Sequence, residues 1–234
     1  VTIVCDLTLP MELDGLKLRE PDIDKLRTLY EQLELRTLLR RVEDTQTESK
    51  QKLLDVDYQV LFTEHELNDW LEKIEAAELV ALDTETTSLD YMRAEIVGLS
   101  LAIELGKAAY IPLAHQYPGA PDQLDREKVL KRLKPWLESP NKKVGHHLKY
   151  DAHVFLNYQI HLNGIAHDSM LESFVLNSTA TRHDMDSVAS KYLNIETTKY
   201  EDVAGKGAKQ ICFDQVDIET AAHYAAEDAD ITLQ

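Results

Sequence analysis

The sequence predicts an α/β fold, in which helices flank a mixed β-sheet. Short apolar or alternating segments, typical of strands, are interspersed with longer segments whose apolar residues recur every three to four positions, typical of helices. The chain has 234 residues, of which 44% are hydrophobic, so it is long enough for one sizeable core and a smaller piece. We therefore expect one main α/β domain, preceded by a small helical segment.

The first 57 residues are predicted to be organised separately from the rest. A short strand-like segment is followed by an amphipathic helix within residues 20–41, where Pro21 lies near the helix start. The polar stretch 41–57 shows no apolar periodicity before Leu53. We expect a helical segment in residues 1–43, a linker in 44–57 and the main domain in 58–234.

The main domain is predicted to begin with a strand, a helix and a group of three strands. Thr63 and Glu66 have the spacing of a capping box, which opens a helix running to about Ala77. Gly106 marks the turn between two of the strands, and Pro135 predicts a bend in the second helix. The predicted strands are residues 58–62, 79–82, 95–104, 107–114 and 142–145. From His147 onward we expect mostly helix, ending in the helix 217–234, whose Glu227 and Asp230 are expected to face solvent.

Composition limits the class of protein. The chain starts at Val1 without a basic leader, which indicates a fragment and gives no sign of export. No apolar stretch reaches the ~18 residues of a membrane span, so we expect no membrane partner. The cysteines Cys5 and Cys212 form no disulfide framework, and a reducing cytoplasm fits best. The formal net charge of −17 argues against bulk electrostatic wrapping of nucleic acid.

An acidic pair ends the apolar run 79–82. Asp83 and Glu85 are two residues apart, and an extended backbone places both side chains on one face. Two carboxylates on one face suit a hard divalent cation such as Mg²⁺, which takes oxygen ligands. Taken alone, the pair also fits two solvated acids at the end of a strand.

Two further segments contain candidate acids. Asp151 follows the predicted strand 142–145 and lies in the first turns of a helix, where it also fits an ordinary acid near the positive end of the helix dipole. Tyr224 and Asp228 are four residues apart on the last helix and so share a face, although this spacing is common by chance. Their order along the chain makes the combination more informative than any one motif.

The combined pattern resembles a known exonuclease family. D-T-E at 83–85, K-Y-D at 149–151 and Y-A-A-E-D at 224–228 are similar to the three motifs of the exonucleases defined by four acidic residues and one tyrosine. Residues 58–234 resemble the ribonuclease H-like 3′→5′ proofreading domain of bacterial DNA polymerase I. Residues 1–43 resemble, more weakly, the end of the 5′ nuclease domain of the same polymerase.

The resemblance implies a two-metal hydrolase of DNA 3′ ends that serves in replication and repair. It makes Asp83, Glu85, Asp151 and Asp228 the metal ligands and Tyr224 the phenol beside the scissile phosphate. The two ions are expected to be Mg²⁺ or Mn²⁺, with Zn²⁺ as an alternative at one position. The implied partners are a single-stranded DNA 3′ end and the polymerase domain of the parent chain, and we expect a monomer.

Four further residues are implied as substrate contacts. These are Leu89, His147, Tyr150 and Arg182. His147 departs from the family, which usually has Asn at this position, and with Asp151 at i+4 it also allows a zinc pair. Without the resemblance, Leu89, Tyr150 and Arg182 fit a core leucine, a packed aromatic residue and a surface arginine.

Two alternative functions stay open from the sequence. The same motif family includes ribonuclease D-like enzymes, which trim RNA. The domain also fits a catalytically silent spacer for the polymerase. The five intact motif positions argue against a silent spacer, and the polymerase-like segments outside the motifs favour DNA.

Overall fold

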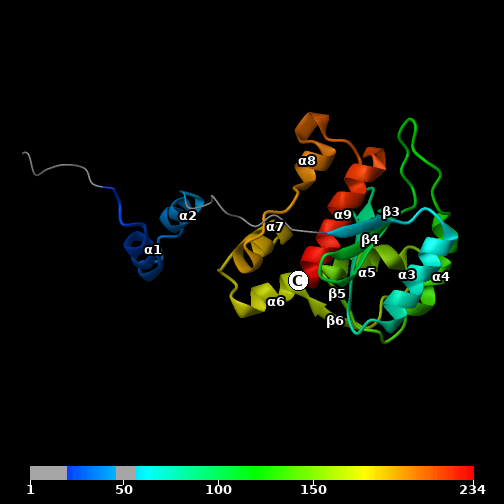
Figure 1. Cartoon of the computed structure of the whole chain (residues 1–234), viewed down its shortest axis with the longest axis horizontal. Coiled ribbons are helices and arrows are strands. Elements are labelled where there is room, and N and C mark those ends of the chain that lie inside the picture. Colours follow the sequence, from blue (N-terminus) through cyan, green and yellow to red (C-terminus); the bar gives the residue numbers. More distant parts are fainter. Residues whose placement is uncertain (1–19, 46–55) are drawn as a thin grey trace, which may run out of the picture. The chain divides into compact units, whose positions relative to one another are not determined.

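The computed structural model describes residues 20–45 and 56–234 (Figure 1). The chain divides into two compact units, residues 1–50 and 51–234. The predicted strand-like segment at the start of the chain and most of the predicted linker lie outside the described residues. No helix in the described part of the chain is both long and apolar enough to cross a membrane.

The first unit contains two helices where the sequence predicted one. Helix α1 spans Ile23–Gln32 and helix α2 spans Arg36–Thr45. Asp22 caps α1 by accepting a hydrogen bond from Lys25 N at 3.1 Å. Glu34 takes a left-handed conformation with φ of 54°, which interrupts the helix. The prediction of one continuous helix is therefore wrong, because apolar periodicity continues across this break.

The second unit is built on a six-stranded mixed sheet in the order β1-β4-β3-β2-β5-β6. Strands β2, β3 and β4 pair antiparallel, whereas the β1–β4, β2–β5 and β5–β6 pairs are parallel. The strands are β1 (Asp57–Val60), β2 (Val80–Thr86), β3 (Ile96–Glu104), β4 (Lys107–Pro112), β5 (Lys143–Gly145) and β6 (Ile165–Asp168). The sequence predicts no strand at β6, because most of its residues are exposed at the sheet edge and leave no apolar signal.

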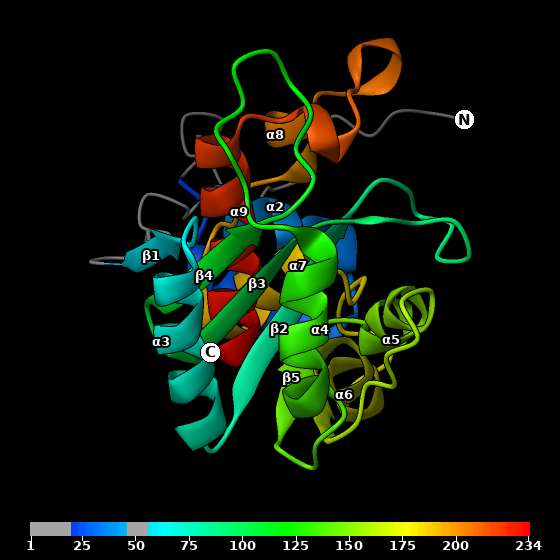
Figure 2. The same cartoon turned by 90° about the vertical axis from the view of Figure 1, so that its right-hand side faces the viewer.

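Helices cover both faces of this sheet. Figure 2 shows α3 and α4 in front of the sheet and α9 behind it. The capping box of Thr63 and Glu66 opens α3 as predicted, and Pro135 lies inside α4. The helices of this unit are α3 (Glu64–Ala76), α4 (Arg126–Leu137), α5 (Leu148–Leu156), α6 (Ser169–Leu176), α7 (Met185–Val188), α8 (Tyr200–Ala204) and α9 (Ile218–Leu233). A π-helical turn, Ala189–Leu193, follows α7, and 3₁₀ turns span Gly207–Lys209 and Phe213–Gln215.

Strand β2 is longer than the apolar run predicted. It continues through the acids to Thr86 because β3 pairs with it along most of its length, with Asp83 opposite Ser100 and Glu85 opposite Gly98. The acids therefore lie within a hydrogen-bonded strand and not beyond its end. This pairing holds the backbone of both acidic residues in a rigid sheet.

Helix α9 packs closely against the sheet through alanines. Ala221, Ala222, Ala225, Ala226 and Ala229 are all buried. The prediction that Glu227 and Asp230 face solvent is wrong, since they are 6% and 0% exposed. Each has hydrogen-bond donors: Thr198 N for Glu227, and Tyr58 Oη and Gly106 N for Asp230. Burial of an acid is tolerated where donors replace water.

Candidate active site

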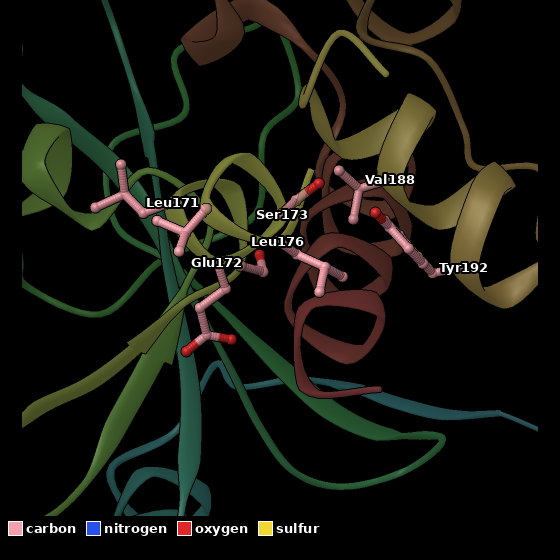
Figure 3. Close-up of a pocket in the computed structure, with 8 residues that line it drawn as sticks. Leu171, Glu172, Ser173, Leu176, Val188 and Tyr192 are labelled. Atoms are coloured by element: carbon pink, nitrogen blue, oxygen red, sulfur yellow. The ribbon is translucent and has the colours of Figure 1, made fainter. Parts of the chain in front are cut away.

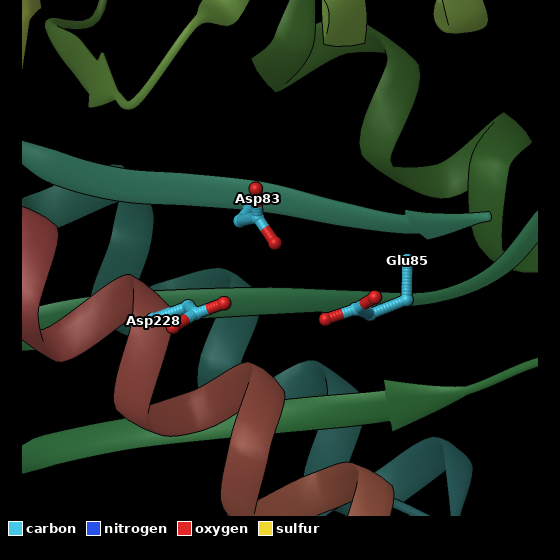
Figure 4. A group of neighbouring side chains, drawn as sticks. All are labelled: Asp83, Glu85 and Asp228. Atoms are coloured by element: carbon cyan, nitrogen blue, oxygen red, sulfur yellow. The ribbon is translucent and has the colours of Figure 1, made fainter. Parts of the chain in front are cut away.

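Three carboxylates converge between β2 and α9. Asp83 and Glu85 project from β2 and Asp228 from α9, and each offers an oxygen within 4.8 Å of the others. Figure 4 shows the three side chains pointing toward one another. Residues separated by more than 140 positions in the sequence thus form one cluster, as the combination of motifs predicted.

This cluster is electrostatically unfavourable without a cation. Burial raises the pKa of Asp83 to about 6. Burial also raises the pKa of Glu85 well above its usual value, and the charges of Asp83, Asp228 and Asp151 raise it further. For Asp228, burial and then the Asp83 charge raise the pKa. Buried like charges favour protonation unless positive charge is supplied.

The donor set fits a hard divalent cation. The group contains only carboxylate oxygens, which are the ligands that Mg²⁺ and Mn²⁺ prefer. Among the described residues this is the one group of three or more metal-ligating side chains, and it includes no histidine or cysteine. Zinc, which favours nitrogen and sulfur, fits this set less well.

Asp151 lies next to the cluster but outside the group of three. It is 3% exposed in the first turn of α5, and its Oδ1 accepts hydrogen bonds from Thr84 N at 3.1 Å and Thr84 Oγ1 at 2.6 Å. Burial and the Asp83 charge raise its pKa well above the usual value, while the Thr84 hydroxyl lowers it. Sequence reasoning missed Thr84, because a threonine within a strand carries no distinctive signal.

Tyr224 is directed toward the same cluster. Burial raises the pKa of Asp228, one turn further along α9, and the Tyr224 hydroxyl lowers it. Burial, followed by the charges of Asp228 and Glu85, raises the pKa of Tyr224 far above the usual value, so the phenol stays protonated. Its ring contacts Tyr200 edge-on and Phe213 at a tilt, with centroids 6.2 Å and 6.1 Å away.

Two of the predicted substrate contacts belong to one local arrangement. Leu89 is 94% exposed, so the alternative of a core leucine is wrong. The Tyr150 hydroxyl donates to Ser88 O at 2.5 Å and shares a hydrogen bond with Thr86 Oγ1. Tyr150 on α5 therefore anchors the loop that presents Leu89.

Arg182 and His147 are both exposed. Arg182 is paired with Asp184 at 3.0 Å, and Asp184 caps α7 through Ser187 N. His147 is the N-cap residue of α5 in a left-handed conformation with φ of 69°, and its ring stacks near Tyr150. His147 and Asp151 do not belong to any group of three potential ligands in the described part of the chain.

An apolar pocket lies elsewhere in this unit. Its volume is about 580 Å³, and it is lined by residues of α6 together with Val188 and Tyr192 (Figure 3). None of the predicted site residues lines it. The motif acids Asp83, Glu85 and Asp228 lie in the acidic cluster and not in this pocket.

Comparison with known proteins defines the family. The model of a 3′-5′ exonuclease family matches residues 58–234. The chain therefore belongs to this 3′-5′ exonuclease family, as the motif pattern predicted.

The family assignment is made more specific by curated relatives. The chain is 51% identical to DNA polymerase I of Pseudomonas aeruginosa over 243 aligned residues, which cover 100% of the chain and 27% of the relative. It is 42% identical to DNA polymerase I of Rhizobium leguminosarum over 186 residues, which cover 72% of the chain and 18% of that relative. The chain thus spans about a quarter or less of the length of these relatives.

A solved structure supports the fold. Escherichia coli RNase D, an exoribonuclease involved in structured RNA processing, superposes with a TM-score of 0.55 at 21% identity, covering 76% of the chain and 43% of that protein. The predicted ribonuclease H-like α/β fold is confirmed.

Proposed function

We propose that this chain hydrolyses the terminal phosphodiester of frayed, single-stranded DNA 3′ ends and releases nucleoside monophosphates as the proofreading part of a DNA polymerase I. The observation that carries the proposal is the convergence of Asp83, Glu85 and Asp228 in a chain of the 3′-5′ exonuclease family. A cluster of uncompensated carboxylates favours the binding of divalent cations, which we assign as two Mg²⁺ or Mn²⁺ ions.

The carboxylates are assigned as metal ligands: Asp83, Glu85 and Asp228 directly, with Asp151 as the fourth. When bound, such ions stabilise the charge that develops on the attacking and leaving oxygens of a phosphodiester. The chain's own residues hold these ligands rigidly, since β2 is paired on both sides and α9 packs against it. To contact an ion, Asp151 has to give up one or both of its hydrogen bonds from Thr84.

Tyr224 and Glu85 are assigned to orient the attacking water. The protonated Tyr224 hydroxyl is a donor, and its interaction with Asp228 suits it to a contact with the scissile phosphate. Glu85 is an acceptor on the neighbouring strand, suited to a water proton. General-base help of this kind typically contributes 10²–10⁴-fold.

The surrounding residues are assigned to the 3′-terminal nucleotide. Leu89 is a fully exposed apolar side chain on a loop anchored by Tyr150, suited to contact a terminal base. The ring nitrogen of His147 and the positive charge of Arg182 are assigned to contact the sugar and the phosphates. Exposed apolar and aromatic side chains of this kind bind bases without sequence preference.

DNA is favoured over RNA as the substrate by the relatives. The identity of 51% to a DNA polymerase I over the whole chain far exceeds the 21% to RNase D, which shows the fold alone. A silent spacer is disfavoured because the motif acids and Tyr224 are present, and three of the acids converge. RNA trimming and a silent spacer remain the outcomes that the assay below would reveal.

We propose the remaining assignments on the same basis. Residues 1–43 are the end of a 5′ nuclease domain, 44–57 a linker and 58–234 the exonuclease domain, with the polymerase domain of the parent chain as the covalent partner. The match to the Pseudomonas relative along the whole chain supports this division. We expect the protein to act in the cytoplasm and as a monomer.

The test is digestion of 5′-labelled single-stranded DNA with Mg²⁺ or Mn²⁺ and with chelator. We expect a ladder shortened from the 3′ end, mononucleotide products, faster cleavage of mispaired than paired ends, and no nucleotide incorporation. A matched RNA substrate should be cut more slowly. A DNA substrate that stays full length in metal, or faster cutting of RNA, contradicts the proposal.

A pair of variants makes the assay specific. Asp83→Asn removes one charge from the cluster, whereas Asp122→Asn makes the same change at an exposed position away from it. Only Asp83→Asn should abolish cleavage. Equal rates for the two variants would place the activity outside the acidic cluster.

A further inference from the structure

One buried hydroxyl beside the acidic cluster has no partner. Ser100 on β3 is 0% exposed, and its Oγ makes no hydrogen bond. In the described part of the chain, only one other buried side-chain atom, Oδ1 of Asp214, shares this property. Because a buried polar group without a partner costs free energy, Ser100 calls for an explanation.

Ser100 lies directly across from Asp83. The two residues are opposite each other in the antiparallel β2–β3 pair, which places their side chains on the same face of the sheet. Opposed residues of this kind have Cβ atoms roughly 4.5–5.5 Å apart, within reach of a hydroxyl and a carboxylate. The hydroxyl is thus next to the acid at the centre of the cluster.

Tyr110, the other residue opposite Ser100, already has a hydrogen-bond partner. Tyr110 is opposite Ser100 on β4, but its hydroxyl bonds to His115 Nε2 at 2.8 Å. The Tyr110 ring lies over Gly98, because a Cβ atom added at Gly98 would overlap the Tyr110 hydroxyl. The ring is therefore directed away from Ser100. Of the two residues opposite Ser100, Asp83 is therefore the one whose side chain can accept a hydrogen bond from the Ser100 hydroxyl.

On the basis of the proposed function, we propose that Ser100 is a positioning residue that donates a hydrogen bond to the ionised Asp83 carboxylate and holds it in the orientation that binds the cation. A carboxylate that ligates a metal is usually fixed by such an outer donor. Asp151 has a comparable donor, since the Thr84 hydroxyl donates to its Oδ1 at 2.6 Å. Ser100 would serve Asp83 in the way that Thr84 serves Asp151.

A purely structural explanation exists and makes the opposite prediction. Gly98, Ser100 and Ala102 are small residues at alternate positions of β3, and α9 packs closely here through its alanines. If small size were the whole reason for Ser100, alanine would serve equally well. It would even stabilise the fold, because it removes a hydroxyl without a partner.

The test is Ser100→Ala, with Mn²⁺ affinity measured by calorimetry without DNA and melting temperature measured in chelator. We expect the Kd for Mn²⁺ to weaken 10–100-fold. The metal-free melting temperature should stay the same or rise by about 2–4 °C. Ser100→Cys keeps a weak donor and should give an intermediate Kd, and cleavage by both variants should recover as Mn²⁺ is raised.

Ser173→Ala is the matched control, because Ser173 is also buried but its Oγ bonds to His183 Nδ1 at 2.9 Å on a different part of the domain. This control should lower the melting temperature and leave the Mn²⁺ Kd unchanged. A Kd for Ser100→Ala within twofold of wild type overturns the inference about Ser100. Absence of Mn²⁺ binding and cleavage in the wild-type chain would instead overturn the proposed function.

Discussion

Two sets of buried or half-buried carboxylates lie in the exonuclease domain, and they differ in what surrounds them. The first set forms the cluster of Asp83, Glu85 and Asp228. The second comprises Asp168, Glu227 and Asp230. In the first set the acids lie next to one another, whereas in the second each acid is held by hydrogen-bond donors.

The second set shows how a fold tolerates a buried acid. Asp168 accepts from the backbone N–H groups of His147, Leu148 and Leu171, at 3.2, 2.9 and 3.1 Å. Asp230 accepts from Tyr58 Oη and Gly106 N, both at 2.8 Å, and so ties α9 to β1 and to the β3–β4 turn. These acids join elements of the fold through hydrogen bonds.

The negative charge of the first set has to be balanced by a bound cation. Asp228 and Asp230 make the contrast sharp, since they are on the same helix, are both buried and are two residues apart. The pKa of Asp228 is raised by burial and then by the charge of Asp83. An acid whose oxygens are used to join elements of the fold is structural, whereas an acid that lies against other carboxylates is a candidate ligand.

The largest expected effect is the loss of DNA cleavage in the Asp228→Ala variant. Loss of a metal ligand should reduce the rate at least a thousandfold, about 4 kcal/mol of barrier. The metal-free fold should be as stable as wild type or slightly more so, since one repelling charge is gone. Saturating Mg²⁺, at about ten times its Kd, should stabilise wild type by roughly 1.4 kcal/mol and the variant by less.

Rates and urea unfolding with and without Mg²⁺ measure these effects. A large loss of metal-free stability in Asp228→Ala would show that Asp228 belongs to the structural set.

Asp230→Ala should show the reverse pattern. It leaves the Tyr58 hydroxyl and Gly106 N without their acceptor, so we expect a loss of roughly 2–4 kcal/mol in the free energy of unfolding. Cleavage at a temperature where the variant is folded should stay within about tenfold. Asp230→Asn, which keeps one acceptor oxygen, should lose less stability. If Asp230→Ala were fully stable but inactive, the division into two sets would fail.

The pH dependence of stability should also separate the two sets. Asp83 has a pKa raised to about 6 by burial, above the ~3.9 of an unfolded chain, so the folded state binds more protons. Its contribution to stability is fully present below about pH 4 and is lost as the pH rises through about 6. Wild type in chelator should therefore lose more stability between pH 4 and 7 than Asp83→Asn does, by roughly 1–3 kcal/mol.

Urea unfolding at several pH values measures this difference. Asp184 and Asp217, whose pKa values are lowered by their hydrogen bonds at helix N-termini and, for Asp184, also by Arg182, act in the opposite direction in both proteins and cancel in the comparison. Identical slopes for wild type and Asp83→Asn would show that Asp83 is not held in an unfavourable charged state.

The smallest effect is expected for His147→Asn. His147 is exposed and lies outside the group of three acids, so the variant should keep cleavage within about tenfold, or 1.4 kcal/mol of barrier. Its Mg²⁺ affinity, measured by calorimetry without DNA, should match that of wild type. A lost metal-binding signal would make His147 a ligand and restore the zinc alternative.

Much of this site could be predicted from local sequence. The two-residue spacing of Asp83 and Glu85 in a strand and the four-residue spacing of Tyr224 and Asp228 in a helix each place two side chains on one face. These periods are properties of the backbone and need no tertiary information. The motif order then predicted the family.

The fold was predicted less completely where local signals are weak. Strand β6 is mostly exposed at the edge of the sheet and has no apolar run, and the break between α1 and α2 at Glu34 lies within a continuous apolar pattern. In both places the backbone conformation is not marked by the apolar periodicity on which the prediction relied.

The sequence by itself determined the class of fold, the set of motif acids and the family. Only the tertiary structure decided which acids lie against one another and which join elements of the fold. Asp228 and Asp230 look alike in sequence, but Tyr58 and Gly106, more than 120 positions away, donate to Asp230. The tertiary structure also shows Ser100 in register with Asp83, because strand pairing brings together residues that no local pattern connects. The role of a buried acid depends on the donors and charges around it, and these come from distant parts of the chain.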